Sequence, residues 1–390
     1  MSSAAVNKGL LPAGFADELP PESAHAAMVV ERLLAGFARH GYRRVGPPLA
    51  EFEETLLAGA GQALAGQMFR LMDPVSQRMM GLRTDMTPQV ARIAATRLGR
   101  APRPLRLSYA GEVMRVRGSQ LRPERQFGQA GVELIGSASR AADVEVLLLA
   151  AESLTAIGVR DLSIDLTHPR LAPSVCEGLG LEREAGERAR QALDHKDAAQ
   201  LAALGGSAGK ILGGLLAATG PADAALAALG RLSLPAAATA MVEELTAVVR
   251  GVSDAAPDLP LTVDPGEFRG LEYHTGVCFT LFARGVRVEL GGGGRYGTAE
   301  GAGSKGGEGG EPATGFTLYM DSLMRAVPAA EASLCLFLPA GTPAAEARRW
   351  RSEGWMAVQG LDPAANAEAD ARRLGCTHGL RGGRAEPLKG

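Results

Sequence analysis

The chain has 390 residues, of which 46% are hydrophobic and 22% are charged, as in ordinary soluble proteins, and this length allows roughly two or three domains. Its 41 basic side chains are balanced by 43 acidic ones. The resulting net charge of -2 excludes a general positive field that would hold nucleic acid backbones. The 51 glycines follow no fixed period, which excludes a collagen-like fibre.

Cysteine spacing and apolar runs indicate the compartment. The four cysteines are far apart and form no C-x-x-C pair, so neither a disulfide framework nor a zinc site is expected. No run approaches the roughly 20 apolar residues of a membrane helix, and the apolar stretch near the N-terminus is too short for a signal peptide. We therefore expect a cytoplasmic protein without membrane contact.

The first predicted elements are a helix and an extended segment. Apolar residues recur at helical spacing over Ala24–Gly41, and the glycine is typical of a helix end. Tyr42–Glu51 is predicted to be extended, because Pro47 and Pro48 cannot lie inside a helix.

A long antiparallel hairpin is predicted next. Leu105–Arg117 alternates apolar and polar residues, and Gln126–Ile135 does the same with Gln129 and Glu133 on one face. The polar loop Arg117–Glu124 joins the two strands.

The middle of the chain is predicted to be mainly helical. Asp143–Gly158 has the pattern of an amphipathic helix, and Val159–Leu166 reads as a short strand. Residues 172–252 consist largely of alanine, leucine, glycine and charged residues, which indicates a helical insertion. Two further strands are predicted at His274–Ala283 and Val286–Leu290, with a tight turn between them.

The end of the chain is predicted to be a small α/β segment over residues 333–390, after a core of residues 1–325. Leu334–Leu338 reads as an apolar strand and Ala344–Glu353 as a helix. Arg381, Arg384 and Lys389 could form a basic tip, although a frayed, solvated terminus would have the same sequence.

The predicted hairpin carries the first candidate site. Gln129 and Glu133 flank Gly131, which leaves space above the sheet, and Arg115 extends from the partner strand. An amide, a carboxylate and a guanidinium around one concavity would suit a zwitterionic ligand. The alternative is a solvated outer face of an antiparallel sheet.

Other patterns are weak alone. The glycines of Arg269–Gly276 and Gly291–Tyr296 are typical of tight turns, and a lone His274 is more often structural than catalytic. No catalytic triad, phosphate-binding loop or metal-ligand spacing is present in the sequence.

An ordered set of motifs resembles the core of histidyl-tRNA synthetases, which are class II synthetases, over about the first 325 residues. The matching segments are Leu11–Pro21 (LPAGFADELPP), Gly41–Glu51 (GYRRVGPPLAE), Leu82–Pro88 (LRTDMTP), Gly111–Gly136 around GEVMRVRG, Arg269–Gly276 (RGLEYHTG) and Gly292–Gly297 (GGGRYG). The resemblance implies an α+β fold with an antiparallel sheet flanked by helices.

Position by position, the resemblance implies a pocket for histidine. Asp85, Thr87 and Gln129 would hold the amino group, and Arg115 and Arg269 the carboxylate. In the same resemblance Glu133 would bind the imidazole with help from Tyr273, while His274 replaces a tyrosine expected near that ring.

The sequence departs from active synthetases where ATP and tRNA would bind. The adenine-side glutamate is missing from the Val116–Gly118 segment that follows Arg115. In Gly315–Leu323 (GFTLYMDSL), Tyr319 stands at a family glycine and Ser322 at the arginine that faces the triphosphate. The C-terminal segment is also shorter than the family's anticodon-binding domain of about 100 residues.

This combination resembles the regulatory subunits of ATP phosphoribosyltransferase, which are synthetase paralogues of histidine biosynthesis. The resemblance implies a non-catalytic homodimer, without cofactor or metal, that joins the short-form catalytic subunit in a hetero-octamer. It would activate that enzyme, transmit feedback inhibition by histidine and bind no tRNA. An active histidyl-tRNA synthetase with a degenerate third motif, and an RNA-binding paralogue, remain as alternatives.

Overall fold

The computed structural model describes residues 9–267, 273–298, 310–329, 334–363 and 366–388. The chain divides into two units, Met1–Pro328 and Ala329–Gly390. Each unit has its own sheet and is described by itself.

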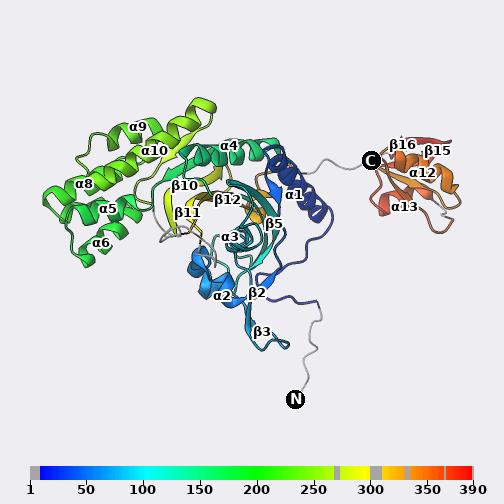
Figure 1. Ribbon diagram of the computed structural model, residues 1–390. Coiled ribbons are helices and arrows are strands. Elements are labelled where there is room, and N and C mark those ends of the chain that lie inside the picture. Colours follow the sequence, from blue (N-terminus) through cyan, green and yellow to red (C-terminus); the bar gives the residue numbers. More distant parts are fainter. Residues whose placement is uncertain (1–8, 268–272, 299–309, 330–333, 364–365, 389–390) are drawn as a thin grey trace, which may run out of the picture. The chain divides into compact units, whose positions relative to one another are not determined.

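A large sheet forms the centre of the first unit (Figure 1). Within the described residues it has nine strands in the order β1-β5-β6-β12-β11-β10-β7-β9-β8. Neighbouring strands are antiparallel except for β1 with β5 and β7 with β9. The strands are β1 (Arg43–Arg44), β5 (Leu105–Met114), β6 (Gln126–Ile135), β7 (Leu162–Thr167), β8 (Gly220–Pro221), β9 (Leu261–Val263), β10 (His274–Ala283), β11 (Gly291–Gly297) and β12 (Pro312–Tyr319). The predicted α+β class with a mainly antiparallel sheet is confirmed.

One predicted strand is wrong. Val286–Leu290 is irregular, and the glycines that follow, which read as a turn in the sequence, form β11. Glycine is required there because a Cβ on Gly293 would lie 2.0 Å from the carbonyl oxygen of Gly315 in β12. The close approach of two strands therefore overrides the turn preference of glycine. The tight turn at Arg284 and Gly285 is present, with a φ of 88° at the glycine.

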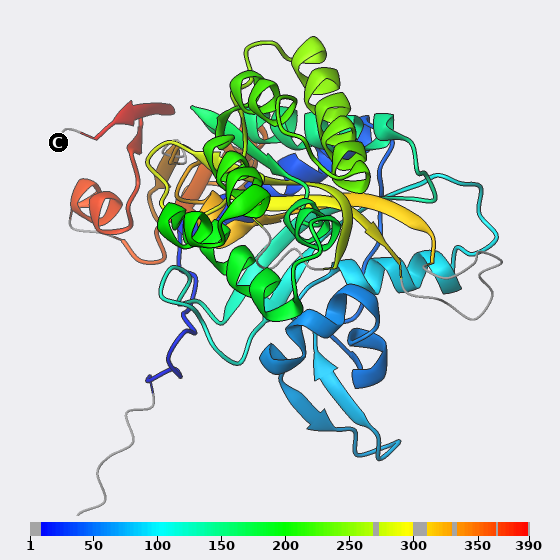
Figure 2. The ribbon, with the colours of Figure 1, turned by 90° about the vertical axis from the view of Figure 1, so that its left-hand side faces the viewer.

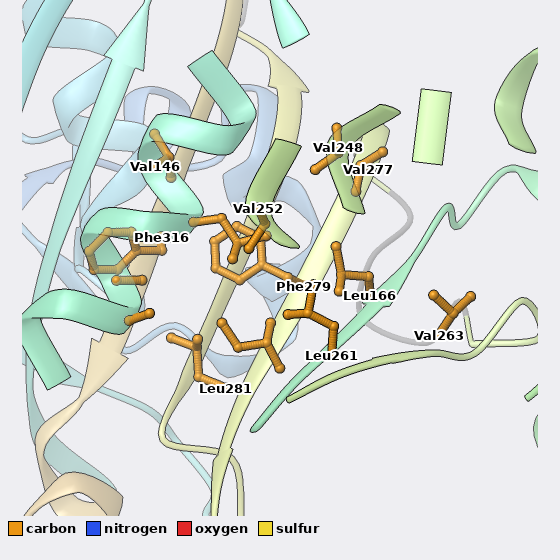
Figure 3. Close-up of a cluster of buried hydrophobic side chains, with 14 of the residues drawn as sticks. Val146, Leu166, Val248, Val252, Leu261, Val263, Val277, Phe279, Leu281 and Phe316 are labelled. Atoms are coloured by element: carbon orange, nitrogen blue, oxygen red, sulfur yellow. The ribbon is translucent and has the colours of Figure 1, made fainter. Parts of the chain in front are cut away.

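Helices α1 (Glu22–Arg39), α4 (Arg140–Ala156) and α10 (Ala236–Ala255) share one core with the sheet. Figure 3 shows Val146 of α4 and Val252 of α10 beside Phe279 and Phe316 of the sheet. Helix α4 begins three residues earlier than predicted, because the hydroxyl of Ser139 accepts a hydrogen bond from the Ala141 amide and caps the helix.

Helix α3 (Thr87–Thr96) contributes to a second core on the opposite side of the sheet. Met86 and Val90 pack there with Tyr109 of β5 and Phe127 of β6. Gln129 and Glu133 are 0% and 1% exposed, so the alternative of a solvated outer face is wrong.

A small sheet and a helical insertion complete the first unit. In Figure 2 the small sheet lies at the lower end and the helical insertion faces the viewer. The small sheet has the order β2-β4-β3. Its elements are β2 (Ala50–Phe52), α2 (Glu53–Leu56), the 3-10 helix η1 (Gly59–Gln67), β3 (Arg70–Met72) and β4 (Met79–Leu82). The predicted helical character of residues 172–252 is confirmed. The remaining helices are α5 (Leu171–Gly178), α6 (Arg183–Asp194), α7 (Ala198–Ala203), α8 (Gly206–Ala217), α9 (Ala222–Leu229) and the short α11 (Met320–Leu323).

The second unit is an α/β layer around a sheet with the order β14-β13-β15-β16. Its elements are β13 (Cys335–Leu338), α12 (Ala344–Ser352), β14 (Met356–Gln359), α13 (Ala367–Arg373), β15 (His378–Arg381) and β16 (Arg384–Pro387). The frayed terminus considered from the sequence is wrong up to Pro387. Gly382 and Gly383 both have positive φ, as the tight turn between β15 and β16 requires. None of the helices described in either unit is long and apolar enough to cross a membrane.

Candidate functional site

Glu133 is the centre of the candidate site. It lies on β6 with its side chain buried on the α3 side of the sheet. The Tyr296 phenol donates a 2.8 Å hydrogen bond to its Oε2, and the Tyr109 phenol donates a longer one of 3.3 Å to its Oε1. Burial raises the pKa of Glu133 to about 8, although hydrogen bonds from Tyr296 and Thr87 act in the opposite direction. This carboxyl is therefore largely protonated at neutral pH and can exchange a proton with a basic ligand.

Gln129 lies four residues before Glu133 on the same face of β6, and its side chain connects this strand to the start of α3. Its amide oxygen accepts a hydrogen bond of 3.1 Å from the Met86 amide, and its Nε2 donates one of 2.9 Å to Oδ2 of Asp85. The other oxygen of Asp85 accepts from the Thr87 amide at 2.8 Å. The structure therefore brings Asp85, Thr87, Gln129 and Glu133 together, with a carboxylate suited to an ammonium group.

Glycines in the sheet make room for these side chains. A Cβ on Gly315 would lie 2.0 Å from Oε2 of Glu133. The sequence predicted open space over Gly131, but the Tyr109 hydroxyl fills it. A Cβ on Gly131 would lie 2.5 Å from that hydroxyl. That hydroxyl also pairs with Thr317 at 2.7 Å. The glycines of the sheet thus leave room for a buried polar network, and this network fills the space.

The other predicted residues lie around this network. Arg115 follows the end of β5, and its guanidinium lies 5.1 Å from the centre of the Phe127 ring, on the same face of β6 as Gln129. Tyr273 is 36% exposed and contacts the ring of Tyr296 at 6.2 Å. His274 is buried, opposite Tyr296 in the β10–β11 ladder. Arg269 lies outside the described residues.

Sequence reasoning assigned no role to Tyr109, Tyr296 or Thr317. Tyr109 lies in a predicted strand and Tyr296 in the GGGRYG motif, but neither pattern marks them as partners of Glu133. The available signal was their strand parity, because a phenol that faces a buried carboxyl must find a hydrogen-bond partner.

A hollow of about 220 Å³ lies along the loop that follows β5. Arg115, Arg117, Arg122 and Glu289 are among its lining residues. Ser322 is fully buried and accepts a 2.9 Å hydrogen bond from Arg122. Within the described ranges, no group of three or more His, Cys, Asp or Glu side chains is placed to hold a metal ion.

Comparison with known proteins identifies relatives of the whole chain. The sequence profile of histidyl-tRNA synthetases matches residues 14–323. The chain is 57% identical over 374 residues to the ATP phosphoribosyltransferase regulatory subunit of Paramagnetospirillum magneticum, with 96% of both chains covered. Its identity to the regulatory subunit of Rhodospirillum centenum is 56% over 380 residues, covering 97% of this chain and 96% of that one.

A solved structure supports the same relationship. The ATP phosphoribosyltransferase regulatory subunit/histidyl-tRNA synthetase of Bacillus halodurans matches with a TM-score of 0.80 and 25% identity. The match covers 95% of this chain and 97% of the Bacillus halodurans chain. The class II synthetase-like fold expected from the motifs is therefore confirmed. The synthetase profile ends inside the first unit, whereas the regulatory subunits match through most of both units.

Proposed function

Because this chain belongs to the family of ATP phosphoribosyltransferase regulatory subunits, which share the histidyl-tRNA synthetase fold, we propose that it regulates that enzyme in histidine biosynthesis without catalysing aminoacylation. In this role it activates the short-form catalytic subunit and makes it sensitive to free histidine. The similarity to proteins of this name over nearly the full length is the observation that carries the proposal.

The network around Glu133 supports histidine as the effector. A buried carboxyl with a pKa of about 8 can give its proton to an imidazole and then pair with the imidazolium. Asp85 and Gln129 offer oxygen atoms to the α-ammonium group, with Thr87 fixing the Asp85 carboxylate. A competing amino acid without an imidazole would leave Glu133 without its ligand partner in a buried site. We assign Arg115, Arg269 and Tyr273 to the same pocket, with His274 next to it.

The third synthetase motif supports a role without adenylation. Ser322 stands where the third motif of the synthetases has an arginine. Its buried hydroxyl accepts a hydrogen bond from Arg122. A serine cannot supply the charge-assisted contact that a triphosphate needs in a transition state. Histidine binding would then persist without transfer of the amino acid to a nucleotide.

The second unit offers little to a tRNA. Three of its arginines pair with two carboxylates of α13, which lowers the positive charge they present: Arg372 and Arg381 pair with Glu368, and Arg373 pairs with Asp370. We propose instead that the chain is a homodimer within a hetero-octamer with the catalytic subunit. A conformational equilibrium biased by histidine would supply a coupling of about 1–3 kcal/mol between the two proteins.

The test is an activity assay of a short-form ATP phosphoribosyltransferase with and without this chain, across a histidine titration. We expect activity to rise when the chain is added and to fall again as histidine increases. A Glu133→Gln variant should retain activation but require more histidine for inhibition. An unchanged catalytic rate on addition of the chain would contradict the proposal.

A second assay addresses the competing synthetase function. We expect no histidine-dependent exchange of pyrophosphate into ATP by the purified chain, because the adenylating contacts are missing. Exchange at the rate of a synthetase would show an active histidyl-tRNA synthetase instead.

A further inference from the structure

Arg122 is a buried cation in the loop between β5 and β6. Its side chain is only 9% exposed. Its Nε donates a 2.8 Å hydrogen bond to Oδ2 of Asp321, and its Nη2 lies 2.9 Å from the hydroxyl of Ser322 and 3.3 Å from a carboxylate oxygen of Glu289. Because two carboxylates face this one guanidinium, its charge is already neutralised within the protein.

The same guanidinium packs over aromatic rings. Its central carbon lies 4.1 Å from the centre of the Tyr319 ring and 5.5 Å from that of Phe127. A planar cation on an aromatic face takes the position in which a planar heterocycle would stack. Arg122 therefore occupies a place that would otherwise suit a nucleotide base.

The hollow beside Arg122 has the lining that phosphates require, but it is small. Arg115 and Arg117 lie along it, and Nε of Arg115 is buried without a hydrogen-bond partner among the described residues. Its volume of about 220 Å³ is below the roughly 300–1,000 Å³ of typical ligand pockets. The neighbouring carboxylates Asp321 and Glu289 would also repel a polyphosphate if Arg122 did not pair with them.

The loop holds Arg122 in this position through contacts of its own. The Ser119 amide donates to the Arg122 carbonyl at 2.7 Å, and the Arg122 amide donates to the Ser119 hydroxyl at 2.9 Å. Farther along, Glu124 pairs with Arg325 at 2.9 Å, and the Val116 amide donates to the Gln67 carbonyl at 2.8 Å. The loop is thus fastened at both sides of the hollow.

We propose that Arg122 excludes nucleotides from this chain by filling the aromatic place beside Tyr319 and closing the arginine-lined hollow. The loss of the motif arginine at Ser322 is then only part of the change. The loop supplies another arginine at the same place, but its charge faces Asp321 and Glu289 instead of a ligand. This makes Arg122 a determinant of ligand specificity, independent of any effect on the catalytic subunit.

The experiment measures binding of Mg-ATP to the full chain alone, by calorimetry. Arg122→Ala alone would leave the Asp321 carboxylate, whose side chain is 7% exposed, buried without its counter-ion. The informative variant therefore combines Arg122→Ala with Asp321→Asn and Glu289→Gln, so that neither carboxylate is left unpaired beside the hollow. We expect this triple variant to bind ATP at least about tenfold more tightly than the unaltered chain.

Arg325→Ala is the matched control, because it removes another arginine contact of the same loop, the one with Glu124, without opening the hollow. Its ATP affinity should equal that of the unaltered chain, and cooperative thermal unfolding of each variant verifies that it is folded. Equal ATP affinity of the folded triple variant and the unaltered chain would overturn the proposal. A gain by Arg325→Ala as large as that of the triple variant would overturn it as well, since loop release alone would explain it. Because no catalytic subunit is present, these outcomes are independent of the proposed regulatory function.

Discussion

The phenol of Tyr296 reaches Glu133 across an intervening strand. Tyr296 lies on β11 and Glu133 on β6, and β12 lies between them in the sheet. The contact is possible because Gly315 of β12, which is paired with Glu133, carries no side chain. The sheet thereby holds this carboxyl group away from water, and that burial raises its pKa to about 8 although the phenols donate hydrogen bonds to it.

Histidine affinity should have a broad optimum between about pH 6.5, the ordinary pKa of imidazole, and pH 8, that of Glu133. In this range a neutral imidazole meets a protonated carboxyl, and the ion pair forms by proton transfer without net proton uptake. Above pH 8 complex formation must take up a proton, and below pH 6.5 it must release one, so affinity falls about tenfold per pH unit on each side. Calorimetry at a series of pH values measures this profile.

Glu133→Gln provides the control for the pH profile. The amide cannot ionise, so histidine affinity should fall and the change near pH 8 should disappear. Titration of the ligand's own ammonium group remains in both proteins and cancels in the comparison. If the histidine affinity of the variant fell above pH 8 as that of the unaltered chain does, the titrating group would be one other than Glu133.

The same carboxyl should make stability depend on pH. Its pKa is about 8 in the folded chain against an ordinary value of 4.5, so the folded state binds the proton more tightly. The stability contributed by protonation is complete below pH 4.5 and is lost as the pH rises from 4.5 through 8, by up to about 5 kcal/mol in total. Glu133→Gln should therefore be more stable than the unaltered chain at pH 8 and similar to it near pH 5. Urea unfolding at both pH values tests this, and equal differences at the two would contradict it.

Local patterns predicted much of the fold. Alternation along Gln126–Ile135 correctly separated Ala130, Val132 and Leu134, which face α1 and α4, from Gln129 and Glu133 on the other side. It could not show that the second face is also covered, because α3 is brought there by the tertiary fold. Burial of Glu133, and hence its altered pKa, follows from that packing and has no local signature.

The errors have the same origin. Four consecutive glycines read as a turn because nothing in their local sequence reveals that β10 and β12 flank them closely on both sides. The contact between Arg122 and Asp321 joins residues 199 positions apart, so no spacing rule could predict it. The histidine pocket and the altered third motif, by contrast, were found by resemblance, and the residue assignments in the pocket stay predictions.

Gly315→Ala should disrupt the site more than an ordinary glycine substitution. Its new methyl group would lie 2.0 Å from the Glu133 carboxylate and 2.4 Å from the carbonyl oxygen of Val132. Overpacking of this kind costs about 1–3 kcal/mol, and displacement of Glu133 should weaken histidine binding as well. Gly46→Ala is the matched control, since no heavy atom lies within 4 Å of its Cβ position. Denaturant unfolding and calorimetry of both variants check the prediction, which fails if the two behave alike.

The buried ion pair between Arg295 of β11 and Asp143 of α4 should couple that helix to the sheet. Nε and Nη2 of Arg295 lie 3.0 and 2.9 Å from Oδ2 of Asp143, and both side chains are less than 10% exposed. Arg295→Met leaves a buried charge unpaired and should cost about 3–5 kcal/mol of unfolding free energy. Adding Asp143→Asn should restore part of the loss, because the unpaired charge is then removed. Arg183→Ala, which breaks an exposed pair with Glu187, should cost less than about 0.5 kcal/mol. If the losses from Arg295→Met and Asp143→Asn simply add in the double variant, the pair contributes no coupling of its own.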